Sequence, residues 1–441
     1  MTARRRAVAF GAMAVLLVAS PGLAAEKLSR LERRLVRHVD EHQAESLRLL
    51  ERVVDINSGT LNFDGVRAVG AIFRAELDGL GFRTRWVDGA AFGRAGHLVG
   101  ERPARDPKAL RVLLIGHLDT VFDKDSPFQR FEHLPGNRAR GPGVIDMKGG
   151  DVVMLAALAA LRATGALDRL NVEVVMSGDE EHAGEPLELA RRDLAVAGER
   201  AAVAIGFEDG DGQLEHAVVA RRGASGWSLR VTGQPAHSSL VFRPEVGDGA
   251  VFELARILDT FRRELGGEAY LTFNPGLALG GTAVDLDPSA VRGTAAGKSN
   301  VVAASALAQG DLRTLSPEQL ERARQRMRDI VAQNLPHTKA EIRFEDGYPP
   351  MAPTAGNRAL LAELDRASRD LGLGPVEATD PGEAGAADVS FVAGSVARII
   401  DGVGLKGSGG HTQQETADLG ALPIQAKRIA VLLARLSGEL R

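Results

Sequence analysis

The feature that most constrains this chain is an apolar run, residues 112–115, that ends in Gly116 and is followed at once by His117 and Asp119. The run has the length and the aliphatic, β-branched composition of a buried strand. Side chains alternate along an extended chain, so His117 and Asp119 point to the same side where the strand ends. The sequence therefore predicts half of a metal site or of a proton relay, unless His117 is a loop residue beside a solvated Asp119.

Helical and strand patterns alternate on both sides of this run. We expect helices at 66–80, 151–164, 358–371 and 424–438, and strands at 82–87, 112–115, 171–176 and 396–400. Such alternation is typical of an α/β fold with a mostly parallel sheet covered by helices. Residues 217–346 follow a β-β-α-β-α-β pattern instead, which predicts an inserted α+β lid and dimerisation domain. The catalytic domain would then be split into 26–216 and 347–441.

The first 25 residues have the composition of a signal peptide. Arg4 to Arg6 precede an apolar stretch at 7–19, and small residues follow at 20–25. The apolar stretch is too short to span a bilayer, although an N-terminal membrane anchor is the alternative. We therefore expect an exported protein, periplasmic or secreted, that uses the Sec route rather than the twin-arginine route.

Composition narrows the chemistry that the remaining residues can perform. The 441 residues include no cysteine, so disulfides and thiolate metal sites are excluded, and any metal must be held by His, Asp and Glu. The formal net charge of −4 offers no basic surplus for nucleic acid. No stretch after the signal peptide is long and apolar enough to span a membrane, so we expect no stable membrane association after cleavage.

Acidic and imidazole residues recur near the carboxyl ends of the predicted strands, where α/β sheets place their binding sites. The series is His117, Asp119, Asp146, Glu180, Glu181, Glu208 and His411. Two imidazoles and several carboxylates suit two Zn²⁺ ions about 3.5–4 Å apart that share a carboxylate and a water. Glu180 and Glu181 point apart, so one can bind metal while the other acts as a general base. Taken singly, a solvated acidic turn at 179–185 and a flexible loop at 407–411 would also explain these residues.

Four motifs, in this order, resemble those of the M20 family of zinc metallopeptidases, particularly its glutamate carboxypeptidase branch. They are GHLDTV at 116–121, GPGVIDMKGG at 141–150, DEE at 179–181 and GGH at 409–411. The resemblance covers nearly the whole chain after the signal peptide. It implies two ligand sets that share Asp146: His117, Asp146 and Glu208 for one zinc, and Asp146, Glu181 and His411 for the other.

The resemblance also implies catalytic roles for two carboxylates. Asp119 would orient the imidazole of His117 through its free ring nitrogen. Glu180 would activate the bridging water and then protonate the leaving amine.

The inserted domain carries three further candidates. The segment TGQPAHSS at 232–239 resembles the lid motif of the family, whose histidine, here His237, stabilises the oxyanion of the reaction, often in the active site of the other subunit. Asn300 and Arg313 resemble the positions that bind the terminal carboxylate of the substrate. A homodimer is therefore implied. The alternatives are a turn residue for His237 and a solvated strand charge for Arg313.

The combined expectation is an exopeptidase with two zinc ions that releases a C-terminal amino acid, with glutamate favoured, from a peptidyl or N-acyl donor. The hydroxyl residue that this branch carries before Asp388 is replaced here by Ala387, which leaves the side-chain preference open. An N-acyl-amino-acid deacylase or a dipeptidase on the same scaffold is the alternative. A non-catalytic periplasmic binding protein is more remote, because it would need neither Glu180 nor His237.

Overall fold

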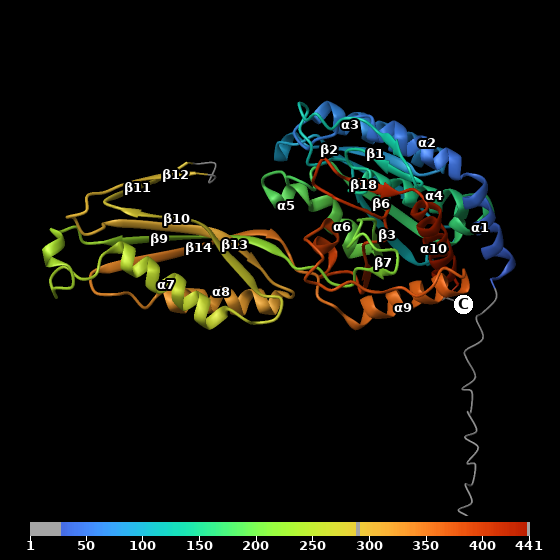
Figure 1. Cartoon of the computed structure of the whole chain (residues 1–441). Coiled ribbons are helices and arrows are strands. Elements are labelled where there is room, and N and C mark those ends of the chain that lie inside the picture. Colours follow the sequence, from blue (N-terminus) through green and yellow to red (C-terminus); the bar gives the residue numbers. More distant parts are fainter. Residues whose placement is uncertain (1–27, 288–291, 439–441) are drawn as a thin grey trace, which may run out of the picture.

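The computed structural model describes residues 28–287 and 292–438, so the predicted signal peptide lies outside the described residues. Two bodies lie side by side and are joined by a narrow connection (Figure 1). One contains both ends of the described chain, and the other is formed by the middle of the sequence. Among the described helices, none has the length and apolar character that crossing a bilayer requires.

A six-stranded sheet of order β1-β2-β6-β3-β7-β16 forms the centre of the larger body. Its strands are β1 (Arg83–Asp88), β2 (Gly96–Arg102), β3 (Arg111–His117), β6 (Asn171–Ser177), β7 (Val203–Gly206) and β16 (Arg398–Ile400). Strand β3 pairs in parallel with β6 and β7, and β7 pairs in parallel with β16, whereas β1 and β2 run antiparallel at one edge. The predicted α/β fold is confirmed.

Both faces of this sheet are buried, because alternate residues of β3 enter different cores. Val112 and Leu114 lie in one core, and Leu113 and Ile115 lie in the other. The first core is covered by α1 (Arg30–Glu41), α2 (Gln43–Val54), α3 (Phe63–Gly79), α4 (Lys148–Thr164), α9 (Ala355–Asp370) and α10 (Ala421–Leu436). The second core is covered by α6 (Arg192–Arg200), which follows α5 (Leu187–Ala190), and by the 3₁₀ helix η4 (Asp388–Val392).

A small antiparallel sheet brings the last part of the chain beside the turn that contains Asp146. Its order is β17-β18-β5-β4, with β4 (Glu132–Leu134), β5 (Arg138–Arg140), β17 (Gly407–Ser408) and β18 (Thr416–Asp418). Strand β5 leads directly into residues 141–146, and the β17–β18 connection contains His411. Residues that are far apart in sequence are thereby placed at one edge of the main sheet.

The second body is an antiparallel sheet of order β10-β13-β9-β14, with two helices on one face (Figure 1). Its strands are β9 (Ala224–Gly233), β10 (Thr272–Gly281), β13 (Ser305–Arg313) and β14 (Thr338–Tyr348). The helices are α7 (Ala250–Leu265) and α8 (Pro317–Val331), and a hairpin of β11 (Ala283–Leu286) and β12 (Gly293–Ala296) lies beside β10. Trp227, Leu229 and Phe261 lie in the core between sheet and helices.

Residues 217–221, which begin the predicted insertion 217–346, pack in the larger body instead. Strand β8 (His216–Ala217) pairs in parallel with β15 (Glu377–Ala378). Val218 then exchanges backbone hydrogen bonds with Asp401 at 2.8 and 2.9 Å. Because these partners belong to the C-terminal part of the larger body, the inserted sheet begins only at β9.

Candidate active site

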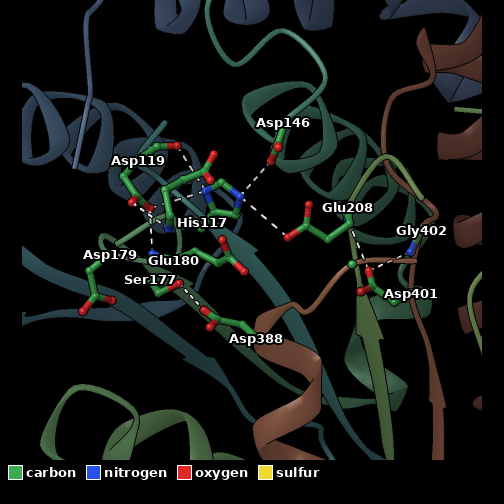
Figure 2. Close-up of polar contacts among 12 residues, drawn as sticks. His117, Asp119, Asp146, Ser177, Asp179, Glu180, Glu208, Asp388, Asp401 and Gly402 are labelled. Atoms are coloured by element: carbon green, nitrogen blue, oxygen red, sulfur yellow. Dashed lines mark hydrogen bonds and ion pairs between the residues drawn. The ribbon is translucent and has the colours of Figure 1, made fainter. Parts of the chain in front are cut away.

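The candidate residues gather at one edge of the main sheet because three of its parallel strands end there (Figure 2). His117 is the last residue of β3, and Glu180 and Glu181 follow the end of β6 by a few residues. Glu208 comes two residues after the end of β7. The α/β topology therefore explains why residues from distant motifs meet.

The structure brings all five predicted metal ligands together in two groups. One consists of His117, Asp146 and Glu208, and the other of Asp146, Glu181 and His411. Within each group the ligand atoms lie within 4.8 Å of one another. The groups are the sets implied by the sequence motifs, and Asp146 belongs to both.

The two carboxylate oxygens of Asp146 face different imidazoles. Oδ1 lies 3.1 Å from Nε2 of His117, and Oδ2 lies 2.9 Å from Nε2 of His411. Glu208 approaches the first imidazole at 3.6 Å, and Glu181 approaches the second at 3.2 Å. A carboxylate with one oxygen in each group has the geometry of a bridging ligand.

The electrostatics of the groups fit bound cations. Burial raises the pKa of Glu208 well above its usual range, and it also raises the pKa of Glu181, with the charge of Asp146 adding to both shifts. Hydrogen bonds to Asp146 and Glu181 raise the pKa of His411 to about 11. Oε1 of Glu181 is buried without a hydrogen-bond partner. Divalent cations would compensate the crowded carboxylates and this oxygen, and imidazole with carboxylate is a donor set that suits zinc.

Asp119 is buried and contacts His117 and Glu180 (Figure 2), and it also contacts the backbone of Glu181. Its backbone carbonyl lies 3.1 Å from Nδ1 of His117, and its Oδ1 lies 3.4 Å from the same atom. The carboxylate accepts the backbone N–H groups of Glu180 at 3.0 Å and Glu181 at 3.2 Å, and the hydroxyl of Thr60 at 2.6 Å. This geometry suits the orienting role that the sequence predicts for Asp119. In addition, the Asp119 carboxylate holds the backbone of Glu180 and Glu181, a contact that the sequence did not predict.

The charge state of His117 depends on the same carboxylates. Burial alone would lower the pKa of His117, but hydrogen bonds to Asp119 and Asp146 and the charge of Glu208 raise it well above its usual range. With Nδ1 directed at Asp119, Nε2 is the nitrogen that faces Asp146 and Glu208, as a metal ligand requires.

Glu180 has the environment of a proton-transfer group. Burial raises the pKa of its carboxyl well above the usual range, and the charges of Asp388, Glu181 and Asp146 add to this effect while His117 opposes it. A carboxyl whose pKa is raised holds a proton more readily than an ordinary one, which suits a group that takes up a proton and returns it.

Two buried carboxylates that sequence reasoning missed hold the ligand-bearing turns. Glu415 accepts the backbone N–H groups of Gly143, Ile145 and Asp146 at 3.0, 2.9 and 3.2 Å. Asp401 accepts the backbone N–H of Glu208 at 3.3 Å (Figure 2). Glu415 lies in a polar run with no periodicity, and Asp401 follows an apolar strand like many turn residues, so neither carries a sequence signal of its own.

Of the inserted-domain candidates, His237 and Asn300 lie together. The backbones of His237 and Val301 form a bridge, the carbonyl of Asn300 accepts the N–H of Ser238, and Nδ1 of His237 lies 2.8 Å from the hydroxyl of Ser239. Strand β9 starts at the connection to the larger body and ends before His237. Since its ten residues span about 30 Å, the imidazole is remote from the metal-ligand groups of its own chain.

Arg313 lies at the opposite end of the inserted sheet. It is the last residue of β13, and Thr314 beside it accepts the N–H of Gly223 in the connection. Its guanidinium pairs with Asp311 at 2.9 Å. The structure therefore separates Arg313 from His237 and Asn300 within one chain.

Comparisons with known proteins place the chain in a peptidase family and agree with the fold. The model of the family described as Peptidase family M20/M25/M40 matches residues 113–435. Carboxypeptidase G2 of Pseudomonas sp. (strain RS-16) is 27% identical over 388 residues, which cover 87% of each chain. The solved structure of aminopeptidase PepT from Bacillus cereus ATCC 10987 has a TM-score of 0.69 at 18% identity and covers 89% of this chain and 98% of its own. A dinuclear metal binding peptidase from the M20 family of Bacillus subtilis has a TM-score of 0.65 at 14% identity, covering 90% and 99%.

Proposed function

The chain belongs to peptidase family M20, and on this premise we propose that it is a di-zinc exopeptidase that releases a C-terminal amino acid, with glutamate favoured, from a peptidyl or N-acyl donor. The observation that carries this proposal is the pair of ligand groups that share Asp146, with the half-buried Glu180 beside them. The similarity to carboxypeptidase G2 supports the carboxypeptidase direction of cleavage. A non-catalytic binding protein is disfavoured, because the family match is to peptidases.

Each site residue has a separate role in the proposed reaction. Zinc held by the two groups would supply Lewis acidity at the scissile carbonyl and lower the pKa of a bound water. Glu180 takes the proton from the attacking water and returns it to the leaving nitrogen. Asp119 keeps the ring of His117 in one orientation and fixes the backbone from which Glu180 extends. Arg313 is the cation proposed to bind the free carboxylate of the substrate.

We also propose that the active enzyme is a homodimer. His237 is proposed to act as the oxyanion donor, yet it lies far from the ligand groups of its own chain, so a second copy has to supply it together with Asn300. Phe242 and Phe252, close to His237 in sequence, are 62% and 53% exposed, with ring centroids 5.4 Å apart. Such an exposed aromatic pair supports a contact between copies.

One observation favours the alternative, an N-acyl-amino-acid deacylase or a dipeptidase. Ala387 is buried and offers no hydroxyl, and the carboxylate of Asp388 is already bonded to Arg191 at 2.9 Å and to the hydroxyl of Ser177. Neither residue is therefore free to recognise a glutamate side chain.

The proposed location is outside the cytoplasm, on the basis of the leader-like segment 1–25. Cell fractionation followed by N-terminal sequencing tests it. A mature protein that starts near residue 26 in the exported fraction is expected, and an uncleaved cytoplasmic protein would contradict export.

The experiment that tests the function measures amino-acid release by the zinc-loaded protein. The substrates are peptides that end in glutamate, alanine or leucine, their C-terminally amidated twins, N-acyl amino acids and dipeptides. We expect release of C-terminal glutamate and resistance of the amidated twins. Preferential cleavage of dipeptides or of N-acyl amino acids other than glutamate would establish the alternative. Failure to hydrolyse any amide with both sites loaded would contradict the proposal.

A further inference from the structure

The backbone on both sides of Glu180 is held by three separate side chains. Asp119 accepts the N–H groups of Glu180 and Glu181. On the opposite side of the chain, Arg191 donates to the carbonyl of Asp179 at 3.1 Å, and the hydroxyl of Tyr348 donates to the carbonyl of Glu180 at 2.6 Å. The peptide units from which the Glu180 side chain extends are therefore fixed at both their N–H and their C=O groups.

Arg191 determines the direction of the Tyr348 hydroxyl proton. This buried guanidinium donates to the carboxylate of Asp179 at 2.6 Å, to that of Asp388 at 2.9 Å, and to the phenol oxygen of Tyr348 at 2.8 Å. A guanidinium has no acceptor, so the phenol oxygen must accept from Arg191. The proton of the phenol is then left to donate to the carbonyl of Glu180, which makes this hydrogen bond a directed one.

The backbone of Tyr348 belongs to the inserted sheet rather than to the predicted catalytic segment 347–441, although its side chain packs in the larger body. It is the last residue of β14, where the pairing with β9 shifts register between Glu345 and Tyr348. Two prolines follow, and Met351 then exchanges backbone hydrogen bonds of 2.9 and 3.0 Å with Arg221 in the other connection. The phenol ring packs edge-on against Phe391 with centroids 4.9 Å apart. The hydroxyl that contacts the carbonyl of Glu180 is thus carried by the segment that joins the two bodies.

We propose that Tyr348 is a positioning residue for Glu180, so that the connection to the inserted domain forms part of the catalytic apparatus. This inference rests on the proposed function, since it takes Glu180 as the general base. The peptide unit that Tyr348 holds links Glu180 to the metal-ligand candidate Glu181. Its release would therefore displace the base relative to a ligand, and misplacement by about 1 Å can cost on the order of 10²-fold in rate.

The test compares two variants, because the chain contains only two tyrosines. Tyr348→Phe removes the hydroxyl and keeps the ring against Phe391, and Tyr270→Phe removes the other tyrosine hydroxyl as a matched control. We expect Tyr348→Phe to lower kcat by roughly 10- to 100-fold, with KM and bound metal close to those of the parent, and Tyr270→Phe to behave like the parent. A Tyr348→Phe variant with parental kcat would overturn the inference. So would a variant whose metal content falls, or whose KM rises, by as large a factor as its kcat falls.

A second measurement does not depend on any substrate. Hydrogen–deuterium exchange of a peptide that spans 178–184 reports the local opening of this backbone. Faster exchange in Tyr348→Phe than in the parent and in Tyr270→Phe supports the inference, and equal exchange overturns it even if the parent hydrolyses no amide. Turnover retained by Glu180→Gln, in contrast, would refute the assignment of Glu180 as the general base and leave the exchange result to decide whether Tyr348 holds this backbone.

Discussion

The carboxylate of Asp119 accepts the backbone N–H of Glu180 at 3.0 Å. A residue just after β3 thereby holds the candidate base, which follows the neighbouring strand β6, while its own carbonyl contacts the imidazole of His117. The first ligand group and the proposed base share this one buried carboxylate. A change at Asp119 is therefore expected to alter the positions of both His117 and Glu180.

Asp119→Asn tests this shared support. An amide provides one acceptor oxygen where the carboxylate provides two, so at least one of its contacts to Thr60, Glu180 and Glu181 is lost. We expect metal affinity to fall by about 10- to 100-fold, together with a loss of turnover, as measured by chelator competition and substrate assays. Asp125→Asn, on an exposed loop, is the control. Parental affinity and rate in Asp119→Asn would refute the role.

Metal stoichiometry tests the bridging role of Asp146. Because this carboxylate belongs to both ligand groups, Asp146→Ala should reduce metal content to well below one ion per chain. His411→Ala removes a ligand from one group only, so it should retain the ion of the group that contains His117. Elemental analysis after gel filtration distinguishes the two variants, and equal losses in both would argue against the shared ligand.

Removal of metal should make stability depend on pH in a defined direction. Without metal, burial raises the pKa values of Glu181 and Glu208, and hydrogen bonds to Asp146 and Glu181 raise that of His411 to about 11. The folded state then binds more protons than the unfolded state, so the free energy of unfolding falls as pH rises. This loss of stability begins above about pH 4.3, where the carboxyls lose their protons in the unfolded chain, and continues above about pH 6.5, where His411 does the same.

Thermal unfolding measures this effect. We expect the Tm of chelator-treated protein to fall between about pH 6 and about pH 9 more steeply than that of the zinc-loaded protein, whose ligands are already deprotonated. Parallel curves for the two forms would show that these groups do not bind metal.

Arg313→Ala tests recognition of the substrate carboxylate. The guanidinium is partly exposed at the connection end of β13, where it pairs with Asp311. Losing a carboxylate clamp should raise KM by roughly 10-fold or more for free acids, with kcat little changed. The C-terminally amidated peptide serves as the control, because Arg313→Ala should cleave it as poorly as the parent does. An unchanged KM for free acids would remove Arg313 from the substrate site.

Four of the five metal-ligand candidates could be predicted because they lie in short motifs, and two of these, His117 and Glu181, lie at or just after the end of a predicted strand. Apolar runs such as 112–115 mark these strands in the sequence, and a parallel sheet places their ends together. Strand β7 was not predicted, because its residues continue an Ala-rich stretch after helix α6, and so short an apolar run does not distinguish strand from helix by periodicity. Strand β10 was missed because it contains Pro275 and Gly276, residues that argue against a strand yet are tolerated at a sheet edge such as this one.

The residues that support the site could not be predicted in the same way. Tyr348 contacts a residue 168 positions earlier in the chain, and Glu415 contacts the Asp146 turn across 269 positions or more. Such contacts depend on how the two connections and the small sheet pack, and no local pattern encodes them. The supporting roles of Tyr348 and Glu415 can be identified only from the structure, which shows the backbone groups that they contact.

The most direct test of the account is the Glu180→Gln variant, with zinc content and turnover measured on the same sample. The account predicts that both zinc ions remain, because Glu180 belongs to neither ligand group, and that turnover falls by roughly 10²-fold or more. Turnover close to that of the parent, or loss of zinc together with activity, would contradict the assignment of Glu180 as the general base.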